Sequence, residues 1–270
     1  AFAEADARHA RLVLVHAWQD DPIVPVALWQ PLYFPPDLEG AHAAAVEVLD
    51  AAVTLAESVA PGVVHERRLC RTPAHVALVE ASHDARLVVV GGRERSRHEA
   101  GWLGPTPLRV VGRASCPVVA VPTEPSLTGP VVVGVDGSAA STEAVAFAFE
   151  EASRTGVELI AVHAFPLTFG GVVIESPRLS ELHEEARREL GEGLAGWREK
   201  FPDVHVTELV SAEHPVRALR LASETARMLV LGTHGRGALG RMLLGSVVAA
   251  VLRIADCPVA VVHPAGADHA

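Results

Sequence analysis

The sequence predicts an α/β protein made of two tandem copies of one domain, each an open, twisted parallel sheet flanked by helices. Short runs of aliphatic and β-branched residues alternate with helix-length segments, which is the pattern of strand–helix–strand units. Residues 85–91 recur as residues 226–232, and the same offset of 141 residues pairs Cys116 with Cys257. The repeat therefore accounts for the length of the chain.

Composition restricts the class of protein. The chain has 270 residues, of which 49% are hydrophobic and 21% charged, as in a globular protein of one or two domains. The net charge of −10 argues against general binding to nucleic acid or to an anionic membrane. Three cysteines without a C-x-x-C pair fit a reducing compartment. Because no signal-like start and no apolar run of about 18 residues occur, we expect a cytoplasmic protein.

The repeat divides the chain into domain 1 at residues 1–122, a linker at 123–130 rich in proline and polar residues, and domain 2 at 131–264. Residues 1–8 correspond to a segment late in the first helix of domain 2. The first strand of domain 1, its glycine turn and its aspartate therefore have no counterpart. Since that strand would be central in the sheet, we expect that the chain lacks its natural N-terminus. A strand supplied by another chain is the alternative.

The rest of domain 1 follows the repeat. Strands are predicted at residues 12–16, 63–69, 87–90 and 117–121, and helices at 41–59 and 73–82. Between the first of these strands and the first helix lies a proline-rich insertion at residues 19–40. Its Trp29, Tyr33 and Phe34 either cap the local core or form a surface for a partner.

Domain 2 contains every element of the repeat. Residues 131–135 are a continuous β-branched run, as a buried parallel strand requires. Further strands are predicted at residues 159–163, 204–210, 228–231 and 258–262, and helices at 141–154, 179–201, 216–227 and from 246 onward.

A glycine-rich loop connects the strand at 228–231 to the last helix. It contains Gly232, Gly235 and Gly245 and reaches Ser246, which has the residue type of an N-cap. The free N–H groups at the positive end of a helix dipole favour an anion such as phosphate. The loop is neither a Walker A loop nor a G-x-G-x-x-G dinucleotide loop. A glycine turn that only connects strand and helix is the alternative, although Arg236 and Arg241 could offset phosphate charge.

The spacing Gly232-x-x-Gly235-(nine residues)-Gly245-Ser246 resembles the ATP-binding signature of the universal stress protein family. The strands at 131–135 and 258–262 resemble the first and last strands of that family. The resemblance covers nearly the whole chain as two copies. It implies a five-stranded, Rossmann-like sheet of the adenine nucleotide alpha hydrolase type in each copy. It also implies that the chain binds ATP. Mg²⁺ is expected on the phosphates, and the sequence identifies no protein ligand for the ion.

The resemblance assigns roles to individual residues of domain 2. Asp136 meets the nucleoside, Ala164 lines the adenine pocket, and the glycines let the backbone approach the phosphates, which receive N–H groups at the start of the last helix. The predicted binding residues are Gly134, Val135, Asp136, Ala164, Leu231, Gly232, His234, Gly235, Arg236, Gly245, Ser246 and Val247.

The predicted binding residues Asp136 and His234, and His163 next to Ala164, could each have another role. Asp136 could instead be the N-cap of the helix that follows it. His163, at the end of an apolar strand, is expected to be a structural histidine with a satisfied hydrogen bond rather than a catalyst. His234 could touch phosphate or face water.

Domain 1 departs from the signature. Glu94 replaces the glycine that matches Gly235, Ser96 replaces another loop glycine, and Pro105 replaces the serine that matches Ser246. Glutamate adds negative charge and does not take positive φ cheaply, and proline removes a backbone donor together with the hydroxyl. Pro107 removes a further N–H. We therefore expect domain 1 to have lost ATP or to bind it poorly.

The favoured function is an ATP-binding stress-response protein in which nucleotide occupancy sets conformation or partner choice. A slow ATP hydrolase and an interaction scaffold with a vestigial site are the alternatives. The sequence contains no positioned acid–base pair, metal-ligand cluster or nucleophile elbow, so no catalytic residue and no metal ligand is predicted. In the family, domains pair through the last strand, so residues 117–121 and 258–262 could form an internal pseudo-dimer. A homodimer also remains open.

Overall fold

The computed structural model describes residues 1–18, 38–92, 104–123, 125, 127–165, 168–169, 172–173, 179–235 and 244–264. It divides into two compact units, residues 1–81 and 82–270, each of which is described by itself. The proline-rich insertion lies almost entirely outside the described residues, so the alternatives for its aromatic side chains are not tested.

The first unit is built on a small parallel sheet. Strands β1 (Leu12–Ala17) and β2 (His65–Cys70) pair in register from Leu12 opposite His65 to Ala17 opposite Cys70. Helix α2 (Leu38–Val59) packs against both strands. The short helix α1 (Phe2–Ala7) precedes β1, and helix α3 (Ala74–Ser82) follows β2. Every residue of β1 is only partly buried.

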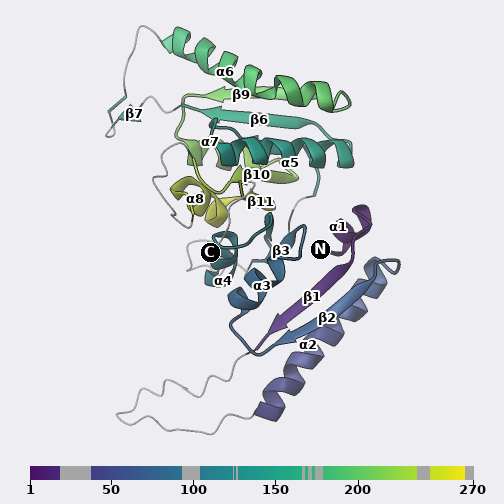
Figure 1. Ribbon diagram of the computed structural model, residues 1–270. Coiled ribbons are helices and arrows are strands. Elements are labelled where there is room, and N and C mark those ends of the chain that lie inside the picture. The colour runs from purple at the N-terminus through teal and green to yellow at the C-terminus, as the bar shows by residue number, and fades with distance from the viewer. Residues whose placement is uncertain are drawn as a thin grey trace, which may run out of the picture. The chain divides into compact units, whose positions relative to one another are not determined.

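The second unit contains a seven-stranded sheet in the order β3-β4-β11-β10-β5-β6-β9 (Figure 1). Its strands are β3 (Val88–Gly91), β4 (Val118–Val121), β5 (Val131–Gly134), β6 (Leu159–Ala164), β9 (Val206–Ser211), β10 (Met228–Gly232) and β11 (Val259–Val262). A separate antiparallel pair consists of β7 (Thr168–Phe169) and β8 (Val172–Val173).

The predicted fold class is confirmed. The five strands of the second copy, β11-β10-β5-β6-β9, form the expected parallel sheet. The strands β4 and β11, which occupy equivalent positions in the repeat, pair antiparallel from Val118 opposite Val261 to Ala120 opposite Val259. The two strands expected to pair therefore do so.

The strands of the first copy are distributed differently from those of the second. Within the described residues β1 and β2 pair only with each other, whereas β3 and β4 extend the sheet of the second copy. In the second copy β5 lies between β10 and β6 and connects the two halves of the sheet. The described residues of the first copy include no strand in that position, and there β1 and β3 share no hydrogen-bonded neighbour.

The element bounds confirm the internal repeat. Helices α2 and α6 (Leu179–Lys200) begin 141 residues apart, as do β2 and β9. The same offset relates α3 to α7 (Pro215–Ser223). Helix α7 ends four residues before the predicted boundary at 227.

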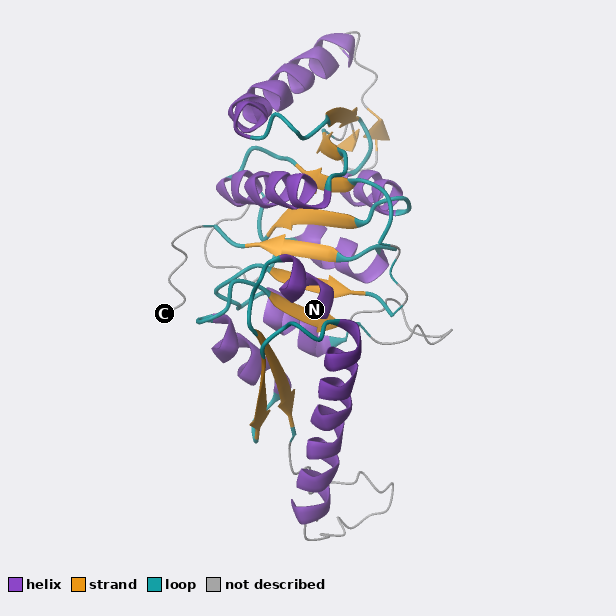
Figure 2. Ribbon diagram, turned by 90° about the vertical axis from the view of Figure 1, so that its right-hand side faces the viewer, coloured by secondary structure: helices purple, strands orange, loops and turns teal. Residues whose placement is uncertain are grey.

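Helices cover both faces of the seven-stranded sheet (Figure 2). Helix α5 (Ala139–Thr155) packs on β5 and against α6, while α7 packs against α8 (Ser246–Ile254). Right-handed crossovers place these two helix pairs on opposite faces. No helix in the described part of the chain is long and apolar enough to cross a membrane.

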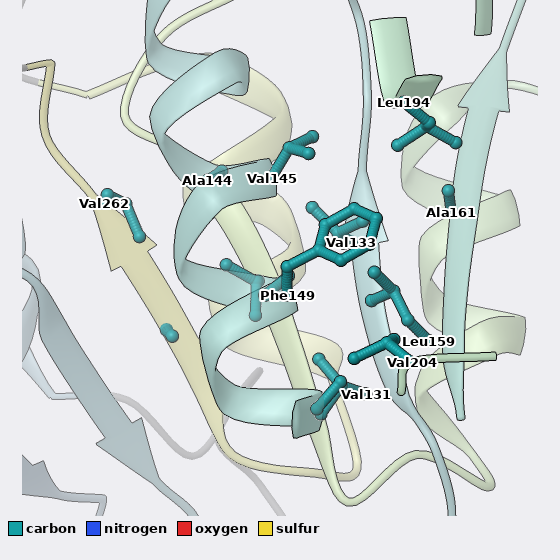
Figure 3. Close-up of a cluster of buried hydrophobic side chains, with 14 of the residues drawn as sticks. Val131, Val133, Ala144, Val145, Phe149, Leu159, Ala161, Leu194, Val204 and Val262 are labelled. Carbon is teal, nitrogen blue, oxygen red and sulfur yellow. The ribbon is translucent and has the colours of Figure 1, made fainter. Parts of the chain in front are cut away.

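The core of the second copy lies between α5, α6 and the sheet. Phe149 of α5 is fully buried and points toward Val133 and Leu159 (Figure 3). Its ring stacks on those of Trp197 and Phe201, with centroids 6.2 and 5.8 Å apart. This packing holds α5 against the sheet.

Candidate functional site

The carboxyl ends of β5 and β10 form the switch point of the sheet. From β5 the chain continues to β6 on one side, and from β10 it continues to β11 on the other. Open α/β sheets bind ligands in the crevice outside such a point. Asp136 follows β5 and Gly235 follows β10, so the structure brings together two of the predicted binding segments.

Two glycines allow the segments to approach closely. A Cβ atom at Gly232 would lie 2.5 Å from the carbonyl carbon of Ala140, at the start of α5. A Cβ atom at Gly235 would lie 2.5 Å from Oδ2 of Asp136. Neither position accepts a side chain without movement of its neighbour. The glycines therefore seat the loop against α5 and against the Asp136 carboxylate.

Ser138 joins the two loops of the crevice. Its hydroxyl donates a hydrogen bond of 3.1 Å to the carbonyl of His234 and accepts one of 3.2 Å from the N–H of Ser141. Ser138, not Asp136, is thus the N-cap of α5. The Asp136 Oδ1 atom accepts the N–H of Ser138 at 3.0 Å, while its own N–H donates to the Ser141 hydroxyl.

Thr233 holds the two ends of the glycine loop together. It is 1% exposed; its N–H donates to Val262 at 3.0 Å and its carbonyl accepts the N–H of Gly245 at 2.9 Å. Its hydroxyl lies 3.0 Å from Nδ1 of His234. These bonds fix Gly245 beside the end of β10. Sequence reasoning missed Thr233, because nothing in its local pattern distinguishes it from any other loop threonine.

The last helix begins at the crevice, but its cap differs from the prediction. Gly245, with extended φ of −66° and ψ of 147°, is the N-cap, and Ser246 is the first helical residue. The prediction of Ser246 as N-cap was therefore wrong by one position, because glycine itself adopts the capping backbone. The first intrahelical bond runs from Ala249 to Gly245 at 2.9 Å. The N–H groups of residues 246–248 precede it, at the positive end of the dipole.

The remaining predicted residues surround this crevice. Gly134 ends β5 and Val135 follows it, Leu231 is buried in β10, and Ala164 ends the neighbouring strand β6. His163 makes the expected structural contact, with Nδ1 2.7 Å from the Val135 carbonyl.

Several residues of the sequence prediction lie outside the part of the chain that the structure describes. Arg236 and Arg241 lie outside the described residues, as do Glu94 and Ser96 of the first copy. Within the described residues, no group of three or more His, Cys, Asp or Glu side chains is placed to hold a metal ion.

The equivalent position in the first copy lacks these features. Helix α4 (Pro105–Val111) is capped by Gly104, as α8 is capped by Gly245. Pro105, the first residue of α4, has no N–H where Ser246 has one. A Cβ atom at Gly91, the equivalent of Gly232, would meet nothing within 4 Å. Among the described residues, the close approach of a strand end to a helix start is therefore found at Gly232 and not at Gly91.

An open α/β sheet with close-packed glycines and a helix N-terminus at its switch point defines a class of proteins suited to phosphorylated ligands. Comparison with known proteins makes the assignment more specific. The model of the universal stress protein family matches residues 1–122 and 128–263. The chain belongs to the universal stress protein family.

Relatives of this family resemble the chain along nearly its whole length. Universal stress protein Rv2005c of Mycobacterium tuberculosis is 39% identical, over 96% of this chain and 89% of that protein. Universal stress protein Rv2623 of the same organism is 36% identical, over 97% of this chain and 89% of that protein. Among solved structures, a universal stress protein from Archaeoglobus fulgidus has the same fold. It has a TM-score of 0.65 and 20% identity, over 94% of this chain and 87% of that one.

Proposed function

We propose that this chain binds ATP in the crevice of its second copy, and that nucleotide occupancy sets its conformation or choice of partner in a stress response. Membership of the universal stress protein family supports the stress-response role. The chemistry of the crevice supports a phosphorylated ligand.

The proposed roles follow from the positions of the residues. Gly245, Ser246 and Val247 offer backbone N–H groups to the phosphates at the start of α8. The Asp136 carboxylate, at the end of β5, accepts hydrogen bonds from nucleoside hydroxyls. Ala164, at the end of the adjacent strand β6, carries a small side chain that leaves room for the base. Mg²⁺ would be held by the phosphates themselves, where it neutralises their charge.

The observation that carries the proposal is the pair of glycines at which a side chain would collide. At Gly232 and Gly235 a Cβ atom would lie 2.5 Å from Ala140 and from Asp136. A loop that served only as a connection would need no such approach to a carboxylate and to a helix start. Gly91 has open space around it, because the first copy has no residue equivalent to Ala140.

A regulatory role is proposed over hydrolysis. The Oδ1 atom of Asp136, at the carboxyl end of β5, already accepts the N–H of Ser138. The Nδ1 atom of His163 lies 2.7 Å from the Val135 carbonyl, so that side of the ring contacts the backbone. In the described residues, each group has its hydrogen bond to the backbone, and the two are not joined as an acid–base pair.

The test is native mass spectrometry of the purified chain with ATP and Mg²⁺, comparing Gly245→Glu with Gly104→Glu. Both substitutions place a carboxylate at the N-cap of an equivalent helix. We expect one ATP per chain in the parent and in Gly104→Glu, and none in Gly245→Glu. Two ATP molecules per chain would refute assignment of the site to the second copy. No binding by the folded parent would refute the proposal and support the scaffold alternative.

We further propose the boundaries 1–122 and 131–264 for the two evolutionary copies, with 123–130 as linker, and a cytoplasmic location. The compact units divide instead after residue 81, because β3 and β4 pair into the sheet of the second copy. The repeat and the compact units describe different properties of the chain, namely its internal homology and its packing.

A further inference from the structure

Helix α2 carries an exposed apolar stripe on one side. The large side chains Val48, Leu55 and Val59 are 51%, 54% and 56% exposed. Ala44 and Ala51, also exposed, complete the row. These five residues, called the α2 stripe, follow one another at intervals of three and four positions, so they share one face of the helix.

The internal repeat allows this face of α2 to be compared with the equivalent face of α6. Both faces are exposed, but only that of α2 is apolar. Helices α2 and α6 bury the same face, since Ala45 and Leu49 of α2 correspond to the buried Ala186 and Leu190 of α6. The α6 equivalents of the α2 stripe are all exposed and almost all polar: Glu185, Glu189, Glu192, Gly196 and Lys200. A copy with its complete sheet therefore leaves this face in solvent.

We propose that the α2 stripe is a homodimer interface in which α2 packs antiparallel against α2 of a second copy of the chain. A two-fold axis between positions 51 and 52 places Ala44 against Val59 of the partner subunit. It also places Val48 against Leu55 of the partner subunit, and leaves alanines at the axis. Small residues at the crossing point let the helices approach, and the patch is complementary to itself, as an isologous contact requires.

The charges around the stripe are compatible with a second copy. Helix α2 contains no lysine or arginine, and its Asp50 pairs with Arg67 of β2, away from the stripe. Glu47 is the carboxylate nearest to the row. The antiparallel arrangement separates the two copies of Glu47 by about 14 Å along the helix axes. That separation exceeds the Debye length of about 8 Å at physiological salt, so their repulsion is screened.

The size of the stripe indicates a weak dimer. Three half-exposed large side chains and two alanines offer on the order of 400 Å² per copy, about half of a standard interface. We therefore expect association in the micromolar range, with a monomer at high dilution. Apolar patches of this size on a monomer are often functional.

Sedimentation velocity over the low to high micromolar range tests the proposal. We expect the parent chain to shift from monomer to dimer, and Val48→Glu combined with Ala51→Glu, which introduces the residues of α6, to remain monomeric. Ala43→Glu, at an exposed position of α2 outside the stripe, is the matched control and should dimerise like the parent. A parent that stays monomeric, or a double variant that dimerises like the parent, would overturn the proposal.

Disulfide cross-linking tests the register independently. Under mild oxidation, a mixture of Val48→Cys and Leu55→Cys chains should form a heterodimer that neither variant forms efficiently alone. The corresponding α6 mixture, Glu189→Cys with Gly196→Cys, should stay unlinked, and circular dichroism verifies folding. Efficient linking of Val48→Cys with itself, or equal linking of the α6 mixture, would contradict the antiparallel α2 contact.

Discussion

Gly232→Ala tests whether the loop and α5 are as closely packed as the structure shows. The new methyl group would lie 2.5 Å from the carbonyl carbon of Ala140, 2.6 Å from its oxygen and 2.8 Å from its Cβ. These atoms belong largely to backbone, so no side-chain rotation relieves the contact. Either the first turn of α5 or the end of β10 must shift. Overpacking of this kind costs about 1–3 kcal/mol of unfolding free energy.

The shift also reaches the proposed nucleotide site, because Asp136 and Ser138 lie between β5 and the first turn of α5. We expect ATP affinity to fall at least about tenfold, the equivalent of about 1.4 kcal/mol. Urea unfolding followed by circular dichroism measures stability. Isothermal titration with ATP and Mg²⁺ measures affinity.

The repeat supplies the matched control, Gly91→Ala. This glycine ends β3 as Gly232 ends β10, but a Cβ atom there meets nothing within 4 Å. We expect its unfolding free energy to change by less than about 0.5 kcal/mol, as for substitutions free of packing conflict. If Gly232→Ala is as stable as Gly91→Ala and binds ATP as the parent does, the argument from close approach is refuted.

Three further predictions concern the second copy and the cysteines. Ser138→Ala should lower the unfolding free energy by about 1 kcal/mol, because α5 loses its N-cap; an unchanged urea midpoint would contradict that role. Phe149→Ala should cost about 3–5 kcal/mol, since the ring is fully buried, and a loss below 1 kcal/mol would show that the core is not centred there. Burial raises the pKa of the Cys116 thiol to about 11 and that of Cys257 to about 12. Both thiols should therefore stay protonated and unreactive near neutral pH, while the half-buried Cys70 is modified by a maleimide; labelling of all three in the folded chain would refute this.

Local pattern and chain order were sufficient for much of the fold. The predicted helix at residues 179–201 is observed as Leu179–Lys200, and the predicted strand at 258–262 as Val259–Val262. Such elements are long or strongly apolar, and their periodicity depends on nearby residues alone. The spacing of the glycines and the resemblance that it carries assigned the loop to a phosphate site before its geometry was known.

The sequence by itself determined the repeat, the second-copy sheet and the place of the candidate site. Only the tertiary structure decided that β3 and β4 join that sheet while β1 and β2 stand apart, that Ser138 and Thr233 tie the site together, and that Gly245 caps α8. It also decided which apolar face of α2 stays exposed. Strand pairing, loop-to-loop hydrogen bonds and burial arise between segments far apart in the chain. Local periodicity therefore contains no information on them.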